Sequence, residues 1–149
     1  MNNTGRPWHL WLIGILSLLW NSYGGYDYYM TQAENAEYLR PMTEPYGVAV
    51  EDALAYFASY PIWLEVLWAL GVWTSVAGAV LMLLRSKFAY YAFIISLIGL
   101  IGAFGWSTAN PQPGLTDTPV AYGMTGLVCV LIILQIIYCR RMTQRGVLR

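Results

Sequence analysis

The sequence predicts an all-α fold, a four-transmembrane-helix up-down bundle with a short amphipathic interfacial helix in its first outer loop. Hydrophobic residues make up 58% of the 149 residues and charged residues only 11%, well below the roughly 25% charge of a soluble domain. The apolar residues gather in four long segments, and the charges separate to opposite ends of these segments. Together these patterns indicate one integral membrane domain covering residues 1–149.

The first helix is expected at about residues 8–29. Its first half, 10–20, is almost entirely apolar, whereas its second half mixes Asn, Ser, Gly and Asp with Trp and Tyr. At 1.5 Å per residue it is roughly 33 Å long, enough to cross a ~30 Å hydrocarbon core. The sequence leaves open a continuation as far as Leu39, and it predicts that Pro41 and Pro45 break the helix.

A second periodicity covers residues 48–60. Val50, Leu54 and Phe57 fall on one helical face while Glu51 and Asp52 point elsewhere, which predicts the amphipathic helix at the membrane–water boundary.

Three further spans are expected at about residues 62–84, 88–106 and 120–138. Only residues 85–87 separate the first two of these, so they must form an antiparallel hairpin. The proline-rich stretch 107–119 is expected to be a loop before the last span.

The charged residues predict the orientation. Seven of the eight Lys and Arg fall on one side of the four spans, and only Arg40 falls on the other. All eight acids lie on the Arg40 side or at helix ends that face it. Because short basic loops stay in the cytoplasm, both termini are expected there, in a bacterial inner membrane. The basic-side residues expected to act as lipid or topology anchors are Arg85, Lys87, Arg140 and Arg141.

A candidate polar cluster is expected at the outer ends of the first two spans: Asn21, Tyr23, Asp27, Tyr28, Glu65 and Trp68. Asp27 and Glu65 come at the same outer level, and ionisable groups near the hydrocarbon layer are functional candidates. They either form a carboxylate pair at the mouth of a cavity for a cation or polar solute, or are two hydrated interfacial acids. Asn21 and Gln135 lie deeper, where interhelical hydrogen bonding is the plain interpretation, with ligand contact by Asn21 the alternative.

Small residues recur at helical spacing and predict close helix packing. The residues assigned to these faces are Gly24, Gly25, Gly71, Ser75, Ala79, Gly99 and Ala103. The pattern does not separate packing within one chain from packing between chains.

The sequence contains no recognisable catalytic, metal or cofactor motif. His9 is its one histidine, and Cys129 and Cys139 are ten residues apart on one predicted helix, too far to bond to each other. We therefore expect no enzyme activity, no metal and no cofactor. The basic C-terminal residues are interpreted as a lipid anchor, with no nucleic-acid partner.

Four stretches resemble a known family: LLWNSYGGYDYYMTQ, YFASYPIWLEVLWALGVW, LLRSKFAYYAF and RRMTQRGVLR. The family comprises small four-helix inner-membrane proteins of proteobacteria, some of which carry the label "sugar transporter". The resemblance covers nearly the whole chain. It implies the same four-helix membrane fold and supplies no functional residue.

Two functions are compatible with these patterns. The first is a non-enzymatic accessory or oligomer-forming subunit that acts through protein or lipid contacts, with the lipid bilayer and either a homo-oligomer or a larger membrane complex as partners. The alternative is a transporter of a small polar, sugar-like solute or a cation through an outward-facing cavity. A solute path would need polar residues across the whole membrane core, whereas the predicted spans carry them only in the outer half. This pattern favours the accessory or oligomer-forming subunit.

Overall fold

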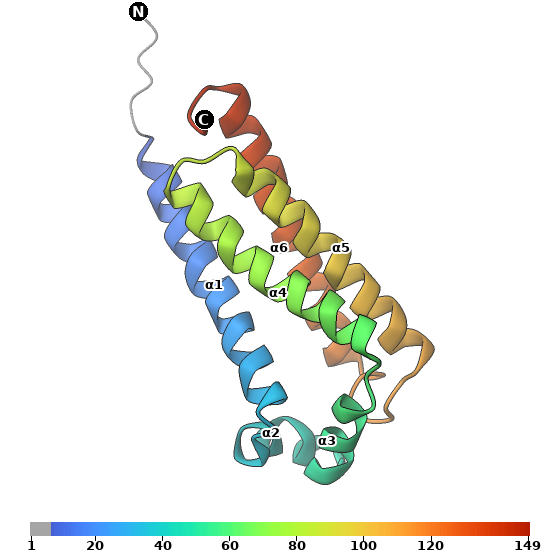
Figure 1. Cartoon of the computed structure of the whole chain (residues 1–149). Helices are drawn as coiled ribbons and strands as arrows, with labels where there is room; N and C mark the ends of the chain where they lie inside the picture. The colour runs from blue at the N-terminus through green and yellow to red at the C-terminus, as the bar shows by residue number, and fades with distance from the viewer. Residues whose placement is uncertain (1–6) are drawn as a thin grey trace, which may run out of the picture.

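The computed structural model describes residues 7–149, and all regular secondary structure in this range is helical. The helices are α1 (Trp8–Gln32), α2 (Ala36–Thr43), the short 3-10 helix η1 (Glu44–Tyr46), α3 (Val50–Ala58), α4 (Ile62–Leu83), α5 (Phe88–Ala109) and α6 (Pro119–Gln144). The four long helices run alternately up and down, and α2 and α3 cover the end opposite the C-terminus (Figure 1). The predicted all-α class is confirmed.

Within the described residues, three helices are long and apolar enough to cross a membrane. The most apolar windows of α4, α5 and α6 have mean hydropathies of 2.0, 1.9 and 2.3, which marks the chain as a membrane protein. Helix α1 has sufficient length at 25 residues. Its most apolar window has a lower mean hydropathy than those of the other three long helices, because its second half contains polar and tyrosine side chains.

The first helix, expected at about 8–29, runs to Gln32, and the continuation to Leu39 that the sequence left open is a separate helix, α2. The chain leaves the helix at Gln32, and Glu34 takes a left-handed φ of 52°. Asn35 then starts a new helix, because its side chain accepts a hydrogen bond from the Tyr38 backbone N–H at 2.9 Å. Pro41 lies inside this helix and does not terminate it, so the predicted break at Pro41 was wrong.

Other predicted boundaries need smaller corrections. The interfacial segment expected at 48–60 is helical only over Val50–Ala58, and the span expected at 62–84 ends at Leu83. The spans expected at 88–106 and 120–138 run instead to Ala109 and to Gln144. Polar residues at these ends were read as helix stops. Polar residues can nevertheless continue a helix, because its backbone hydrogen bonds do not depend on apolar side chains.

Helices α4 and α5 touch through their backbones. A Cβ atom added to Gly99 would lie 2.5 Å from the Leu67 carbonyl oxygen and 2.7 Å from the Gly71 nitrogen. The Ser96 hydroxyl donates to the Gly71 carbonyl at 2.6 Å across the same contact. Small residues therefore allow a helix approach that any larger side chain at Gly99 would prevent.

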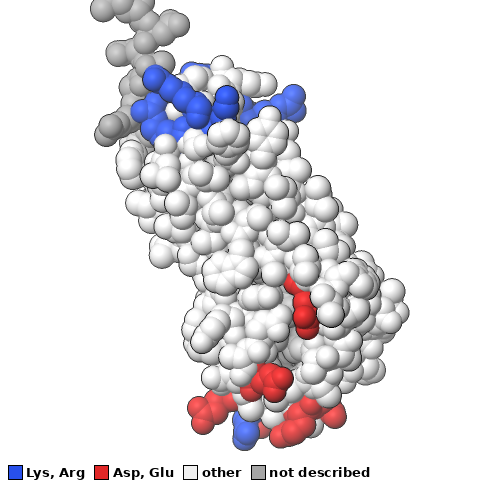
Figure 2. Space-filling model, viewed as in Figure 1, with Lys and Arg blue, Asp and Glu red and all other residues white. Residues whose placement is uncertain are grey.

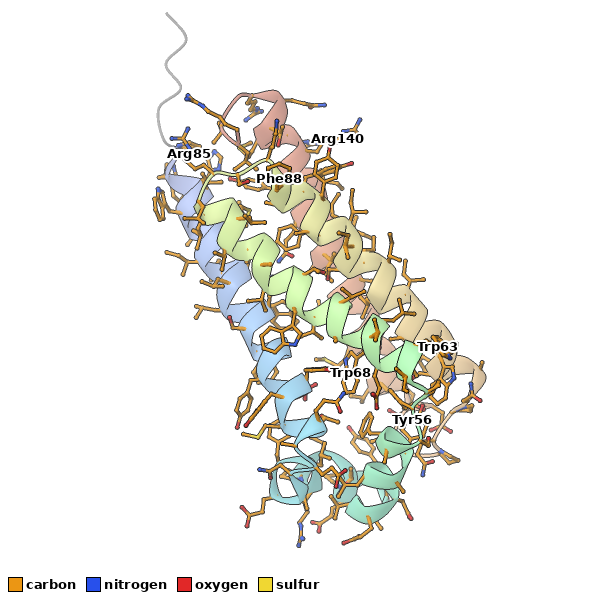
Figure 3. All side chains as sticks on the ribbon, viewed as in Figure 1. Tyr56, Trp63, Trp68, Arg85, Phe88 and Arg140 are labelled. Carbon is orange, nitrogen blue, oxygen red and sulfur yellow. The ribbon has the colours of Figure 1, made fainter. Side chains whose placement is uncertain are left out.

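The basic end of the bundle has a tightly packed interior. Leu10, Met82, Phe93, Cys139 and Leu148 bring α1, α4, α5, α6 and the C-terminal residues together, each at most 1% exposed. This arrangement fills the end of the bundle where Arg85, Phe88 and Arg140 are labelled in Figure 3.

Residues 146–149 fold back beneath the α4–α5 connection. The Arg85 backbone is left-handed, with a φ of 61°, and its Nε donates to the Val147 carbonyl at 3.1 Å. The Arg149 backbone N–H donates to the Arg85 carbonyl at 2.8 Å. Arg85 was expected to be a lipid or topology anchor, and the structure gives it this second role within the chain.

Charges separate along the long axis of the molecule. Figure 2 shows Lys and Arg gathered at the end that carries the α4–α5 connection, Asp and Glu at the end covered by α2 and α3, and an uncharged band between them. Arg40 lies on α2 at the acidic end, 3.9 Å from Glu44. Arg6, which the sequence places with the basic group, lies outside the described residues.

Replacing Gly99 with alanine should lower the free energy of unfolding by about 1–3 kcal/mol, because backbone atoms of α4 cannot move aside as a flexible side chain could. The matched control is Gly105→Ala on the same helix, where an added Cβ meets nothing within 4 Å. Denaturant unfolding of both purified variants in detergent micelles checks this. Equal stability of the two variants would contradict the backbone contact.

Candidate functional site

A cavity of about 650 Å³ lies at the acidic end of the bundle. Its walls come from the ends of α1, α4, α5 and α6, and α2, η1 and α3 contribute its outer side. Among the described residues that line it, Asp27 is the one charged side chain. The remaining lining combines apolar and aromatic side chains with hydroxyl groups, a composition typical of small-molecule sites.

Asp27 is held by a hydrogen bond from outside its own helix. The Tyr38 hydroxyl donates to Asp27 Oδ1 at 2.9 Å, which ties α2 to α1. Burial raises the pKa of Tyr38, and the hydrogen bond to Asp27 raises it further. The phenol therefore remains protonated at neutral pH and donates to one carboxylate oxygen, while no hydrogen bond from residues 7–149 engages the other oxygen.

An aromatic wall closes the cavity on the side of α3 and α4. Trp68 stacks on Phe57 with ring centroids 5.8 Å apart and an interplanar angle of 24°. Tyr28 of α1 meets the same indole edge-on at 4.9 Å, and Tyr60 lies 5.8 Å away. Aromatic pairs in these geometries stabilise beyond simple area burial. Trp68 consequently connects three helices, near the labelled Tyr56 in Figure 3.

Helix α3 is fixed to the bundle through Tyr56. This buried side chain donates to the Asn110 carbonyl at 3.0 Å and lies 3.4 Å from the Ser107 hydroxyl. Burial is the main cause that raises the pKa of Tyr60, and the neighbouring Tyr56 is the second. The Tyr60 phenol therefore stays neutral, and Asp27 is the one acidic side chain among the described residues that line the cavity.

The predicted polar cluster does not come together as one site. Asp27 and Trp68 line the cavity, and Tyr28 packs edge-on against Trp68 outside the lining. Tyr23 is exposed, and Glu65 lies half-buried in the first turn of α4, outside the lining. The sequence placed Asp27 and Glu65 at the same outer level, and in the structure Asp27 lines the cavity whereas Glu65 does not.

Asn21 and Gln135 are partners of each other. Both side chains are buried, and Asn21 Nδ2 donates to Gln135 Oε1 at 3.5 Å between α1 and α6. Towards the basic end, His9 Nδ1 lies 2.7 Å from the Tyr138 hydroxyl and joins the same two helices. Asn21 therefore serves the interhelical role expected of it and lies outside the acidic-end cavity.

The small-residue faces separate into contacts and open positions. Gly71 and Gly99 form the α4–α5 contact, Gly25 faces Val76 and Trp73 at ordinary distances, and Gly24 has open space around it. Ser75 and Ala79 are buried in the bundle, while Ala103 lines the cavity.

The sequence interpretation missed Tyr38 because it missed α2. Asn35 followed by a helical pattern is an N-cap signal, and it could have located the start of α2 and hence the turn that returns Tyr38 to Asp27. Phe57 was identified as part of an amphipathic face, but not as the stacking partner of Trp68. Within residues 7–149, no three His, Cys, Asp or Glu side chains come together to hold a metal ion.

In comparisons with known proteins, no family model, curated protein or solved structure matches this chain. The resemblance to a family of proteobacterial inner-membrane proteins therefore remains a prediction.

Replacing Tyr38 with phenylalanine should lower the free energy of unfolding by about 1–3 kcal/mol, because the Asp27 carboxyl loses its donor in a partly buried setting. Tyr29→Phe is the matched control, since Tyr29 is 62% exposed and its change should stay within about 0.5 kcal/mol. Thermal and denaturant unfolding in detergent measures both. A Tyr38→Phe variant as stable as the control would show that the bond contributes little.

Proposed function

We propose that this chain is a four-span protein of a bacterial inner membrane with both termini in the cytoplasm. The support is the charge separation in Figure 2, since basic residues favour the cytoplasmic side. Helix α1 would be the fourth span, with Asn21 bonded to Gln135 of α6 and Asp27 in the cavity lining. Helix α3 would lie at the outer interface, because Val50, Ala53 and Tyr56 are buried while Glu51 and Asp52 are exposed.

The proposed topology predicts the labelling of single cysteines from one side of the membrane. The background is a cysteine-free variant in which serine replaces Cys129 and alanine replaces Cys139. In this background, Glu44→Cys should react with a membrane-impermeant maleimide on spheroplasts. Gln144→Cys should react only after permeabilisation. Both positions are exposed, so a lack of reaction reflects the membrane and not burial. Reaction of Gln144→Cys on intact spheroplasts would refute the orientation.

In this orientation the cavity lies in the outer half of the bundle, and its proposed role is to bind a small organic cation without catalysing a reaction. The single observation that carries this proposal is Asp27, a lone carboxylate set in a lining that includes Trp68, Phe57 and Tyr60. A carboxylate attracts an ammonium group, and aromatic faces attract both the cation and its apolar substituents. Partial exclusion of water strengthens both attractions.

Binding is favoured over a continuous transport path because buried core residues close the centre of the basic half of the bundle. The packed residues around Met82, Phe93 and Cys139 lie between the cavity and the basic end. A transporter of a polar, sugar-like solute or a cation, the alternative from the sequence, would need these residues to separate. The cavity is compatible with the outward-facing half of such a cycle.

Asp27→Asn should weaken the binding of choline and tetraethylammonium by about 10- to 100-fold, or about 1.4–2.8 kcal/mol, because it removes the negative charge that attracts the quaternary ammonium group. Glu65→Gln is the matched control, since Glu65 is an acid at the same end outside the lining. Isothermal titration in detergent micelles, with glucose as the neutral probe, measures this. Binding of glucose alone would favour a sugar-like solute, and binding of no probe would remove the cavity's proposed role.

The second candidate is an accessory or oligomer-forming subunit. The observation that favours it is the exposure of α6, of which 11% of the most apolar window is buried, against 28% for α4. Lipid or another membrane protein would cover the rest. Mild-detergent isolation with mass spectrometry distinguishes these occupants: a stoichiometric protein partner would favour the accessory role, and a lone monomer would weaken it.

A further inference from the structure

A second cavity, of about 580 Å³, lies between α1 and α6 in the basic half of the bundle. Its sides are mainly apolar, with Leu16 and Trp20 on α1 and Leu134 and Ile137 on α6 among them. It is separate from the cavity that contains Asp27, since the two share no lining residue. We refer to it as the α1–α6 groove.

The groove exists because α1 and α6 are joined by side chains and not by close backbone packing. Helix α1 packs on α4, and α6 packs on α5. The Asn21–Gln135 bond at 3.5 Å and the His9–Tyr138 contact at 2.7 Å connect the two helices at separate levels. A helix about 10 Å across cannot enter between helices whose side chains meet in this way, whereas a single hydrocarbon chain is narrow enough.

The length and the charge of the groove match one leaflet of a bilayer. From Leu131 to Arg141, the first and last lining residues of α6, the helix rises about 15 Å, half of a ~30 Å hydrocarbon core. Arg141, at the end of this path, is the one charged residue in the lining among the described residues. Figure 2 shows that Lys and Arg side chains gather at this same end. A phosphate is complementary to this position, because a guanidinium binds phosphate oxygens through two parallel hydrogen bonds.

We propose that the α1–α6 groove binds one anionic phospholipid of the bilayer, with an acyl chain against Leu16 and Leu134 and the headgroup phosphate at Arg141. This site goes beyond the proposed solute cavity and does not depend on it, because no residue is shared. Ser17 and Gln135 in the groove are 5% and 8% exposed. Gln135 already bonds Asn21, so the groove offers an acyl chain a mostly apolar path.

The test uses the full chain in mild detergent, titrated with dioleoylphosphatidylglycerol and with dioleoylphosphatidylcholine, and native mass spectrometry to count bound lipids. The wild type should retain one phosphatidylglycerol in preference to phosphatidylcholine. Arg141→Gln should weaken phosphatidylglycerol binding about fivefold, the contribution of one basic residue near an anionic lipid. Arg140→Gln, one residue away and outside the lining, should weaken phosphatidylglycerol binding clearly less than Arg141→Gln does.

Two further arms separate a groove site from general surface attraction. Ser17→Phe, which places a ring in the groove, should remove the bound lipid, whereas Ser22→Phe at an exposed position of α1 should not. Free sn-glycerol 3-phosphate should not compete, because it lacks the acyl chain. Equal losses in Arg140→Gln and Arg141→Gln, or competition by the free headgroup, would overturn the proposal. Should Ser17→Phe fail to fold, the arginine pair decides.

Discussion

The backbone contact between α4 and α5 is the constraint on which the rest of the structure depends. Gly99 meets Gly71 and the Leu67 carbonyl so closely that a single added carbon would clash, and Ser96 adds a hydrogen bond across the contact. In a membrane, helices gain little from hydrophobic burial, so close van der Waals packing and such bonds hold the pair together. The hairpin is thus the part of the bundle to which the other two long helices attach.

Because α1 attaches to α4 and α6 to α5, the side between α1 and α6 is left incompletely packed. The Asn21–Gln135 bond crosses it, and the two cavities on this side share no lining residue. Both cavities therefore follow from one feature of helix arrangement. Each polar bridge across this side also satisfies buried groups that would otherwise destabilise the chain in a hydrocarbon medium.

The two cavities differ in chemistry because the charges of the chain are segregated. The cavity at the acidic end contains a carboxylate, Asp27, whose orientation is set by Tyr38. The groove at the basic end contains a guanidinium, Arg141, and is otherwise lined chiefly by apolar side chains. A cation and an anionic lipid are the complementary ligands, and the same charge separation that would orient the chain in a membrane assigns one to each end.

The sequence by itself determined the four long helical segments, the membrane character and the charge separation, because hydropathy, helix length and charge position are local properties. It also identified Asp27, Trp68 and the small residues Gly71 and Gly99 as positions of interest. Only the tertiary structure decided that Tyr38 binds Asp27, that Asn21 pairs with Gln135 and that Glu65 stays outside the cavity. These outcomes depend on the rotation of each helix about its axis and on the turn at Glu34, which are set by packing between residues far apart in the chain.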